Sequence, residues 1–189
     1  MCGRYTLFAD REIQDLEDIL ARIDNETGKE KPKTGEIFPS DAAPVLIRGK
    51  AEAEPRLLTW GFPGFKNKQL IINARAETVI EKPMFHRAFE SRRCIIPSTG
   101  FYEWDREKNK YLFNLPDSAM LYMAGLYSIF DQEERFVILT KDANKTVSQV
   151  HSRMPVVLGK RDLNNWIYDR EAAVRILTGS GPDLVSRIG

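Results

Sequence analysis

The chain has 189 residues, of which 42% are hydrophobic and 29% are charged, and its formal net charge is +1. This length and composition match an ordinary globular protein with one core, so we predict a single domain over residues 1–189. A net charge this close to zero excludes a global field that would attract nucleic acid. Any nucleic-acid site must therefore depend on the local placement of arginines.

Cysteine usage and apolar runs narrow the cellular setting. Cys2 and Cys94 are the two cysteines, which excludes a disulfide framework and indicates a reducing compartment. Charged residues interrupt the start of the chain before any apolar run, so we expect no signal peptide. The longest apolar stretch, 119–130, is broken by Gly125 and Ser128 and is too short to span a bilayer. We expect a cytoplasmic protein that makes no contact with a membrane.

Short strands dominate the middle of the chain. Strands are predicted at residues 5–8, 45–47, 57–60, 70–72, 94–97, 111–115, 120–126, 135–140 and 156–158. Helices are predicted at residues 13–23, with Asp10 as N-cap, at 84–91, with Pro83 in the first turn, at 163–168 and at 171–177. Asp142 is expected to cap a further short helix that ends at Val150, and the polar stretch 25–36 is expected to be a loop. Because most strands follow one another through turns, we predict an α+β fold with mainly antiparallel sheets.

The most unusual feature is a cysteine directly after the initiator methionine. If Met1 is removed, Cys2 carries a free α-amine and a thiol on adjacent carbons. The pKa of an α-amine is about 7.7–8.0, so about a tenth of such amines are unprotonated at pH 7. An unprotonated amine attacks an aldehyde to give a Schiff base, and the adjacent thiol can then close a five-membered thiazolidine ring. Cys2 is therefore a candidate aldehyde trap, although a cysteine at this position can equally have no function.

Glu103 and His151 are candidate acid/base residues. Glu103 stands between Tyr102 and Trp104, and a carboxylate among aromatic side chains is expected to have a raised pKa and to hold a proton. Strand alternation allows the alternative that Glu103 faces solvent. His86 lies in a charged stretch and is expected at the surface. His151 lies at a predicted helix-to-strand junction, where functional groups often occur, or it is a structural histidine.

One asparagine and three arginines lie close to these candidates. Asn73 ends an apolar run, and Arg75 follows on the same face of an extended chain. Arg4, Arg75 and Arg153 each lie one or two residues from a candidate reactive group, and guanidinium forks suit phosphate. Each arginine could equally form a surface salt bridge, and Asn73 could simply cap the next turn.

Other kinds of site have less support. The two cysteines and two histidines include no closely spaced pair of ligands, so we expect no metal site. The sequence contains no G-x-x-x-x-G-K or G-x-G-x-x-G phosphate loop. It also lacks the G-x-S-x-G nucleophile elbow.

Six short motifs occur in a fixed order along the chain. They are Cys2-Gly3-Arg4-Tyr5, Trp60-Gly61, Asn73-Ala74-Arg75-Ala76-Glu77-Thr78, Arg92-Arg93-Cys94, Gly100-Phe101-Tyr102-Glu103-Trp104 and His151-Ser152-Arg153-Met154-Pro155. Each motif alone is weak, but the ordered set closely resembles the SOS-response-associated peptidase (SRAP) family, whose members shield abasic sites in single-stranded DNA. The resemblance implies a barrel-like or sandwich core of mainly antiparallel sheets with a few peripheral helices.

The resemblance also implies a reaction. Family members remove their own Met1, and the exposed Cys2 condenses with the open-chain aldehyde of an abasic deoxyribose to form a thiazolidine crosslink. By analogy, Asn73 would orient the α-amine and the sugar, and Glu103 would be the general acid/base. His151 would position the sugar hydroxyl or the thiolate, shuttle a proton and assist reversal of the crosslink. Weak strand-cleaving lyase activity is also implied, and no cofactor or metal is required.

The same resemblance assigns DNA-binding roles. Arg4, Arg75 and Arg153 match family positions that hold the DNA backbone. The residues that look like groups stacking against or wedging bases beside the lesion are Pro39, Trp60 and Trp104. The expected partner is single-stranded DNA with abasic sites, bound by a monomer in the bacterial cytoplasm.

Two departures from the family pattern and two other functions remain open. Ser98-Thr99-Gly100 replaces an Ala-Asp-Gly often seen before the aromatic-Glu-Trp motif. Pro83 stands where many bacterial relatives have an arginine, so either Lys82 or Arg87 replaces that phosphate contact or the contact is missing. A thiol peptidase that cleaves other proteins and a non-catalytic module that binds single-stranded DNA are the alternatives.

Overall fold

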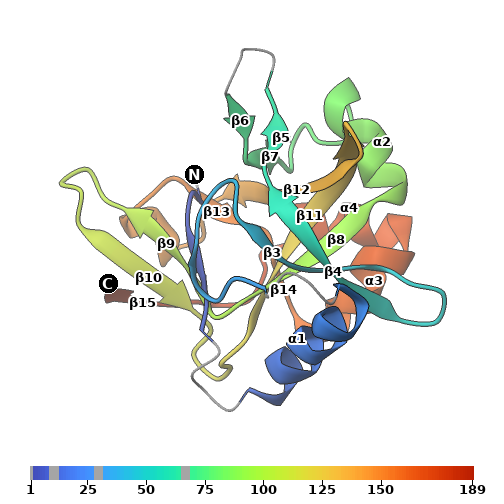
Figure 1. Ribbon diagram of the computed structural model, residues 1–189. Coiled ribbons are helices and arrows are strands. Elements are labelled where there is room, and N and C mark those ends of the chain that lie inside the picture. The colour runs from blue at the N-terminus through green and yellow to red at the C-terminus, as the bar shows by residue number, and fades with distance from the viewer. Residues whose placement is uncertain (1, 9–12, 28–31, 65–68) are drawn as a thin grey trace.

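The computed structural model describes residues 2–8, 13–27, 32–64 and 69–189 (Figure 1). Its helices are α1 (Gln14–Thr27), α2 (Pro83–Ser91), α3 (Leu163–Tyr168) and α4 (Arg170–Thr178), with 3-10 turns η1 (Val147–Gln149) and η2 (Lys160–Asp162). Its strands are β1 (Tyr5–Leu7), β2 (Gly35–Ile37), β3 (Ala42–Arg48), β4 (Ala53–Trp60), β5 (Phe62–Pro63), β6 (Leu70–Ile71), β7 (Asn73–Arg75), β8 (Arg93–Ser98), β9 (Gly100–Trp104), β10 (Lys110–Asn114), β11 (Leu121–Phe130), β12 (Glu133–Asp142), β13 (Arg153–Pro155), β14 (Val157–Leu158) and β15 (Val185–Ile188).

A five-stranded barrel forms the core. Strands β12, β4, β3, β8 and β11 pair in that order, and β11 also pairs with β12, so the ring closes. All pairs in the ring are antiparallel except β12 with β4. Beyond its partner β4, strand β12 is joined by β7 in parallel, and its last residues pair with β13. The C-terminal end of β12 is therefore where three chain segments meet.

A second, antiparallel sheet lies against the barrel in the order β15-β10-β9-β1-β2. Its inner face is aromatic, because Phe101 of β9 and Phe113 of β10 stack with ring centroids 5.2 Å apart. Tyr5 of β1 reaches the barrel, where its ring centroid lies 5.3 Å from that of Trp60. Figure 1 shows the β9–β10 hairpin on the side of the molecule away from α1, α3 and α4. Strand β1 is thus part of the second sheet, and its Tyr5 packs on the barrel.

Helices cover the outside of the barrel. Helix α1 packs on β3 and β4, α2 on β8 and β11, and α3 on β3 and β8. The apolar positions Leu16, Ile19 and Ile23 of α1 are buried, as the helical spacing predicted. No helix within the described ranges is long and apolar enough to cross a bilayer.

The structure confirms the α+β class, the mainly antiparallel pairing and the barrel-like core. The loop expected over 25–36 is wrong at both ends, because α1 continues to Thr27 and β2 begins at Gly35. The helix expected from Asp142 is also wrong. Asp142 ends β12 opposite Arg153 of β13, and only the short turn η1 follows before residue 150. Asp10, the expected cap of the first helix, lies outside the described residues.

Candidate functional site

Cys2 is buried beside the barrel and is held there by Asn73. Its side chain is 0% exposed, and the side-chain amide of Asn73 donates a hydrogen bond from Nδ2 to the Cys2 carbonyl oxygen at 2.9 Å. Asn73 begins β7, whose parallel pairing with β12 places it opposite Ile138. The bond therefore ties Cys2 to a strand that is paired with β12 of the barrel.

The Cys2 thiol is strongly held in its protonated form. Burial raises the pKa of this thiol, and the negative charge of Glu103 raises it further. The protonated thiol donates a weak hydrogen bond to the backbone oxygen of Arg4, which lies 3.8 Å from the sulfur. In this state Cys2 is a thiol rather than a thiolate.

Glu103 reaches Cys2 through the pairing of β9 with β1. Tyr5 pairs with Phe101, and the amide of Tyr102 donates to the carbonyl of Arg4 at 2.9 Å, so continuing this register places Glu103 opposite Gly3. Glu103 shares the inner face of β9 with Phe101 and is 3% exposed. The interpretation of Glu103 as a solvent-facing residue is therefore wrong. Burial raises its pKa as its aromatic neighbours suggested, and the His151 ring opposes this rise when it is protonated.

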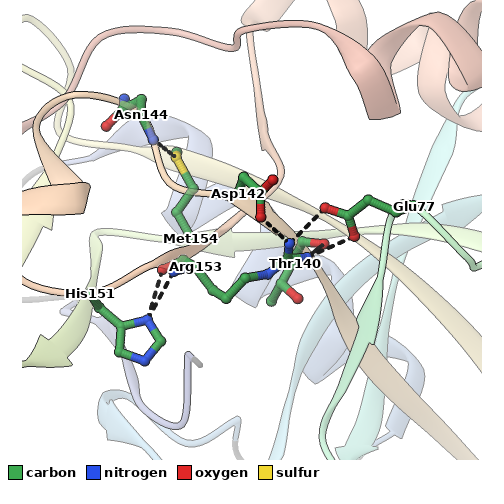
Figure 2. A network of polar contacts seen from close by, with 7 residues as sticks. All are labelled: Glu77, Thr140, Asp142, Asn144, His151, Arg153 and Met154. Atoms are coloured by element: carbon green, nitrogen blue, oxygen red, sulfur yellow. Dashed lines mark hydrogen bonds and ion pairs between the residues drawn. The ribbon is translucent and has the colours of Figure 1, made fainter.

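His151 lies between η1 and β13, at the predicted junction. The backbone amide of Arg153 donates a hydrogen bond to Nδ1 of His151 at 3.0 Å. Nδ1 also lies 3.2 Å from the Arg153 carbonyl oxygen, so it accepts from the amide in one tautomer and donates to the carbonyl in the other. Figure 2 shows Nδ1 turned toward Arg153 and the other ring nitrogen directed away from that backbone. His151 thus presents Nε2 away from its own backbone.

The four predicted catalytic residues come together in space. Asn73 is bonded to Cys2, the charge of Glu103 acts on the Cys2 thiol, and His151 acts on Glu103. They come from β7, the segment before β1, β9 and the loop before β13, which are far apart in sequence. A cleft of about 950 Å³ is lined by His151, alone among the four, and by Trp104, which follows Glu103. Their catalytic roles stay predictions, but the meeting point that those roles require exists.

The three predicted phosphate-binding arginines differ in what holds them. Arg75 of β7 is exposed, and no other described residue bonds its guanidinium. Arg4 packs between the rings of Phe38 and Trp104, with Cζ 4.3 Å and 5.1 Å from their centroids, and its Nη1 lies 3.2 Å from Glu36 Oε2. Of these two, Arg75 has the guanidinium that is more open to a phosphate.

Arg153 is enclosed by oxygen atoms (Figure 2). Its Nη1 lies 2.6 Å from Glu77 Oε1 and 2.6 Å from Asp142 Oδ1. Its Nη2 lies 2.8 Å from Glu77 Oε2 and 2.7 Å from the Thr140 carbonyl oxygen. These bonds raise the pKa of Arg153, led by the one to Glu77, and the same contact lowers the pKa of Glu77. The network joins the turn after β7 to the strand that follows His151.

The predicted base-stacking residues also differ. Trp60 is 0% exposed, stacks on Phe136 at a centroid distance of 6.2 Å, and donates from Nε1 to the Ile72 carbonyl at 3.0 Å. A side chain so enclosed is not available to a base, and its observed role is in the core. Trp104 and Pro39 are half-buried, and Trp104 lines the cleft, so both retain accessible surface.

The acidic partners of the arginines, Glu36, Glu77 and Asp142, were not singled out from the sequence. Glu77 stands inside the motif that begins at Asn73, and this was the available signal. Asp142 was interpreted as a helix cap, which hid its pairing with Arg153. In the part of the chain that the structure describes, no group of three or more His, Cys, Asp or Glu side chains is placed to hold a metal ion.

Comparison with known proteins places the chain in a family. A family model described as SOS response associated peptidase (SRAP) matches residues 1–180. The abasic site processing protein YoaM of Bacillus subtilis is 32% identical over 185 residues, covering 88% of this chain and 79% of YoaM. The abasic site processing protein YedK of Escherichia coli is 29% identical over 181 residues, covering 88% of this chain and 79% of YedK. A crystal structure of a Bacteroides thetaiotaomicron protein shares the fold, with a TM-score of 0.79 at 22% identity over 99% of this chain and 91% of that one. The chain therefore belongs to the SRAP family.

Proposed function

We propose that this protein processes abasic sites in single-stranded DNA by a covalent crosslink through Cys2, formed after Met1 is removed. Relatives named as abasic site processing proteins support the choice of lesion. They include the HMCES protein of Xenopus tropicalis, 26% identical over 76% of this chain and 56% of that protein. The observation that carries the proposal is the junction of Cys2 with Asn73 and Glu103 beside His151.

The proposed chemistry balances without an oxidant or a reductant. The α-amine of Cys2 adds to the C1′ aldehyde, and loss of water leaves an imine. The thiol then adds to the imine carbon, forming a carbon–sulfur bond, and its proton moves to the nitrogen. The product is a thiazolidine plus one water molecule. The second step is intramolecular, so it proceeds at high effective concentration.

Each side chain has a role that its surroundings suit. Burial raises the pKa of Glu103 and so favours its protonated form, which can give a proton to the departing hydroxyl and recover one from the amine nitrogen as the imine forms. Nε2 of His151, which is turned away from its own backbone, can form a hydrogen bond with a sugar hydroxyl, which both donates and accepts. The buried Oδ1 of Asn73 accepts no hydrogen bond from any described residue, so it is available to the α-amine or the sugar. The same acid/base groups would serve reversal of the crosslink and strand cleavage.

The proposed grip on DNA is local. Arg75 and Arg4 would bind phosphates on either side of the lesion, Arg153 would do so after rearrangement, and Trp104 and Pro39 would stack on bases. With a net charge of +1, reversible binding should be modest and should weaken steeply with salt. The covalent bond makes the residence time independent of this weak grip.

A thiol peptidase that cleaves other proteins is less well supported. Such enzymes use a thiolate whose pKa is lowered by a neighbouring base, whereas burial raises the pKa of Cys2 here. Turnover of a peptide library that is lost in Cys2→Ser would restore this alternative. A non-catalytic binding module would bind abasic and intact strands alike, with or without Cys2.

The test combines an oligonucleotide carrying one abasic site with a matched intact strand. Wild-type protein should give a shifted band on a denaturing gel with the abasic strand only, and its intact mass should lack Met1. Cys2→Ser keeps the α-amine but loses the sulfur, so it should yield an adduct only when borohydride traps the imine. A wild-type protein that gives no shifted band, or that keeps Met1 under all conditions, would overturn the proposal.

A further inference from the structure

The guanidinium of Arg153 has no free donor on its two terminal nitrogens. Glu77 binds both nitrogens, at 2.6 Å and 2.8 Å, while Asp142 and the Thr140 carbonyl each bind one, at 2.6 Å and 2.7 Å (Figure 2). Each terminal nitrogen carries two protons, so all four are used. The fifth donor, Nε, has no partner among the described residues but is buried, so a DNA phosphate can reach Arg153 only by taking the place of one of these acceptors.

Asp142 is the acceptor that is easiest to replace. Glu77 is held by two parallel bonds, which is the stronger arrangement, whereas Asp142 makes one. The side chain of Asp142 is 89% exposed, against 45% for Glu77, and exposed single ion pairs contribute little to stability. The Thr140 carbonyl belongs to β12 and cannot leave without breaking the strand.

The position of Asp142 matches the path of the proposed ligand. It lines the same cleft as His151 and Trp104, the side chains assigned to the sugar and to base stacking. Its oxygen lies on Arg153 at a charge-assisted hydrogen-bond distance, where a phosphate oxygen would lie. Arg153, Glu77 and Asp142 together carry one positive and two negative charges, so the cluster repels a phosphate until one carboxylate withdraws.

We propose that Asp142 stands in for a DNA phosphate on Arg153 in the free protein and so weakens binding to undamaged strands. This inference rests on the proposed function. An intact strand must displace Asp142 and gains no covalent bond in return. An abasic strand meets the same opposition, but the crosslink then holds it. Asp142 therefore sets discrimination between lesion and intact DNA rather than the chemistry of capture.

Glu36 provides a contrast within the same molecule. It binds Arg4 at 3.2 Å, but it also binds Lys110 at 2.6 Å and is only 30% exposed. Its bond to Lys110 lowers the pKa of Glu36, with Arg4 contributing, so the carboxylate is fixed between two cations. We expect Glu36 to remain in place when a strand binds, unlike Asp142.

The test is Asp142→Asn, which keeps the shape of the side chain and removes its charge. Fluorescence anisotropy with an intact single strand at low salt should show about three- to tenfold tighter binding, with the gain shrinking as salt rises. The crosslinking rate at saturating abasic DNA should stay at the wild-type value. The matched control is Asp117→Asn, an exposed residue after β10 with no ion pair to another described residue. Equal affinities for Asp142→Asn and Asp117→Asn would overturn the inference.

Arg153→Gln distinguishes a failure of the proposed role of Asp142 from a failure of the proposed phosphate contact of Arg153. If it weakens binding and lowers the salt slope while Asp142→Asn has no effect, the inference fails and the proposed grip stands. If Arg153→Gln leaves both affinity and salt slope unchanged, Arg153 binds no phosphate, so the inference fails, whereas the proposed contacts of Arg4 and Arg75 and the crosslink through Cys2 stand. Urea unfolding checks that each variant is folded. If Arg153→Gln is not folded, Arg153→Lys replaces it in the same measurements.

Discussion

The amide of Asn73 is the direct physical link between Cys2 and the barrel, and two substitutions test what it does. Nδ2 donates to the Cys2 carbonyl oxygen at 2.9 Å, and Cys2 is fully buried. Asn73→Ala leaves that buried acceptor without its donor. Loss of one partner of a buried hydrogen bond costs about 1–3 kcal/mol, which is roughly a 5- to 150-fold slower crosslinking rate if the bond is needed in the transition state.

Asn73→Asp should be worse than Asn73→Ala at neutral pH, although it is the closer match in shape. An ionised carboxylate has no proton to donate, and it would place a charged oxygen about where Nδ2 now lies, 2.9 Å from the carbonyl oxygen. The protonated acid can donate that bond. Because the carbonyl favours the neutral form, the pKa of the new carboxyl should rise. The variant should therefore recover toward the wild-type rate as the pH falls.

The assay is single-turnover crosslinking with protein in excess over an abasic oligonucleotide, followed on denaturing gels across a range of pH. Lower pH also protonates the α-amine of every protein, so the measured quantity is the ratio of variant to wild-type rate at each pH. That ratio should rise with acidity for Asn73→Asp and stay flat for Asn73→Ala. Flat ratios for both variants, or an aspartate variant that is faster than alanine throughout, would refute the hydrogen-bond role of Asn73.

Glu103→Gln should raise the free energy of unfolding at neutral pH and change it little in acid. Burial raises the pKa of Glu103 above its unfolded value, so the stability linked to its proton is complete below the unfolded pKa and is lost as pH rises through the folded pKa. Urea titrations at several pH values check this. A difference in unfolding free energy between the two proteins that stays the same at every pH would contradict it. Gly125→Ala should lower the unfolding free energy by about 1–3 kcal/mol, because a new Cβ would lie 2.8 Å from the Val137 carbonyl oxygen. An unchanged urea midpoint would show that the barrel can relax there. Arg93→Lys should cost a similar amount, about 1–3 kcal/mol, because it removes the Nε bond to the Trp166 carbonyl at 2.6 Å. A thermal midpoint equal to that of the wild type would show that the hydrogen bond from Arg93 Nε to Trp166 does not contribute to stability.

The spacing of apolar residues predicted the positions of the helices well. For the barrel it predicted the strands and their mainly antiparallel class, but not their order. The structure has α3 at Leu163–Tyr168, as predicted, because its apolar positions Trp166 and Ile167 face the core. The closure of the barrel depends on β12, which pairs with β4, β7, β11 and β13. Only β11 is joined to β12 by a tight turn, and no local sequence pattern around β12 predicts its pairing with β4, β7 or β13. The sequence therefore predicted the class of sheet but not which strands meet at the site.

Alternation failed at Glu103 for a physical reason. The alternation of buried and exposed side chains assumes that one face of a strand is exposed to solvent, but Phe101, Tyr102 and Glu103 are all buried. Lys110 covers the outer ring face of Tyr102 at 3.7 Å from the centroid, so both faces of β9 are enclosed. The motif resemblance identified the residues of the site, whereas their burial and the acidic partners of the arginines required the fold.

The burial of Cys2 fits an aminothiol trap better than it fits a thiolate nucleophile. A thiolate at this position would be open to oxidation and to other electrophiles, and burial with the nearby charge of Glu103 suppresses it. In the proposed sequence the α-amine attacks first, and its reactivity does not depend on the thiol. The sulfur acts only after an imine has formed on the adjacent nitrogen, where intramolecular addition overcomes its low ionised fraction. A raised thiol pKa therefore costs little in capture, and it keeps the sulfur inactive until an aldehyde has been bound.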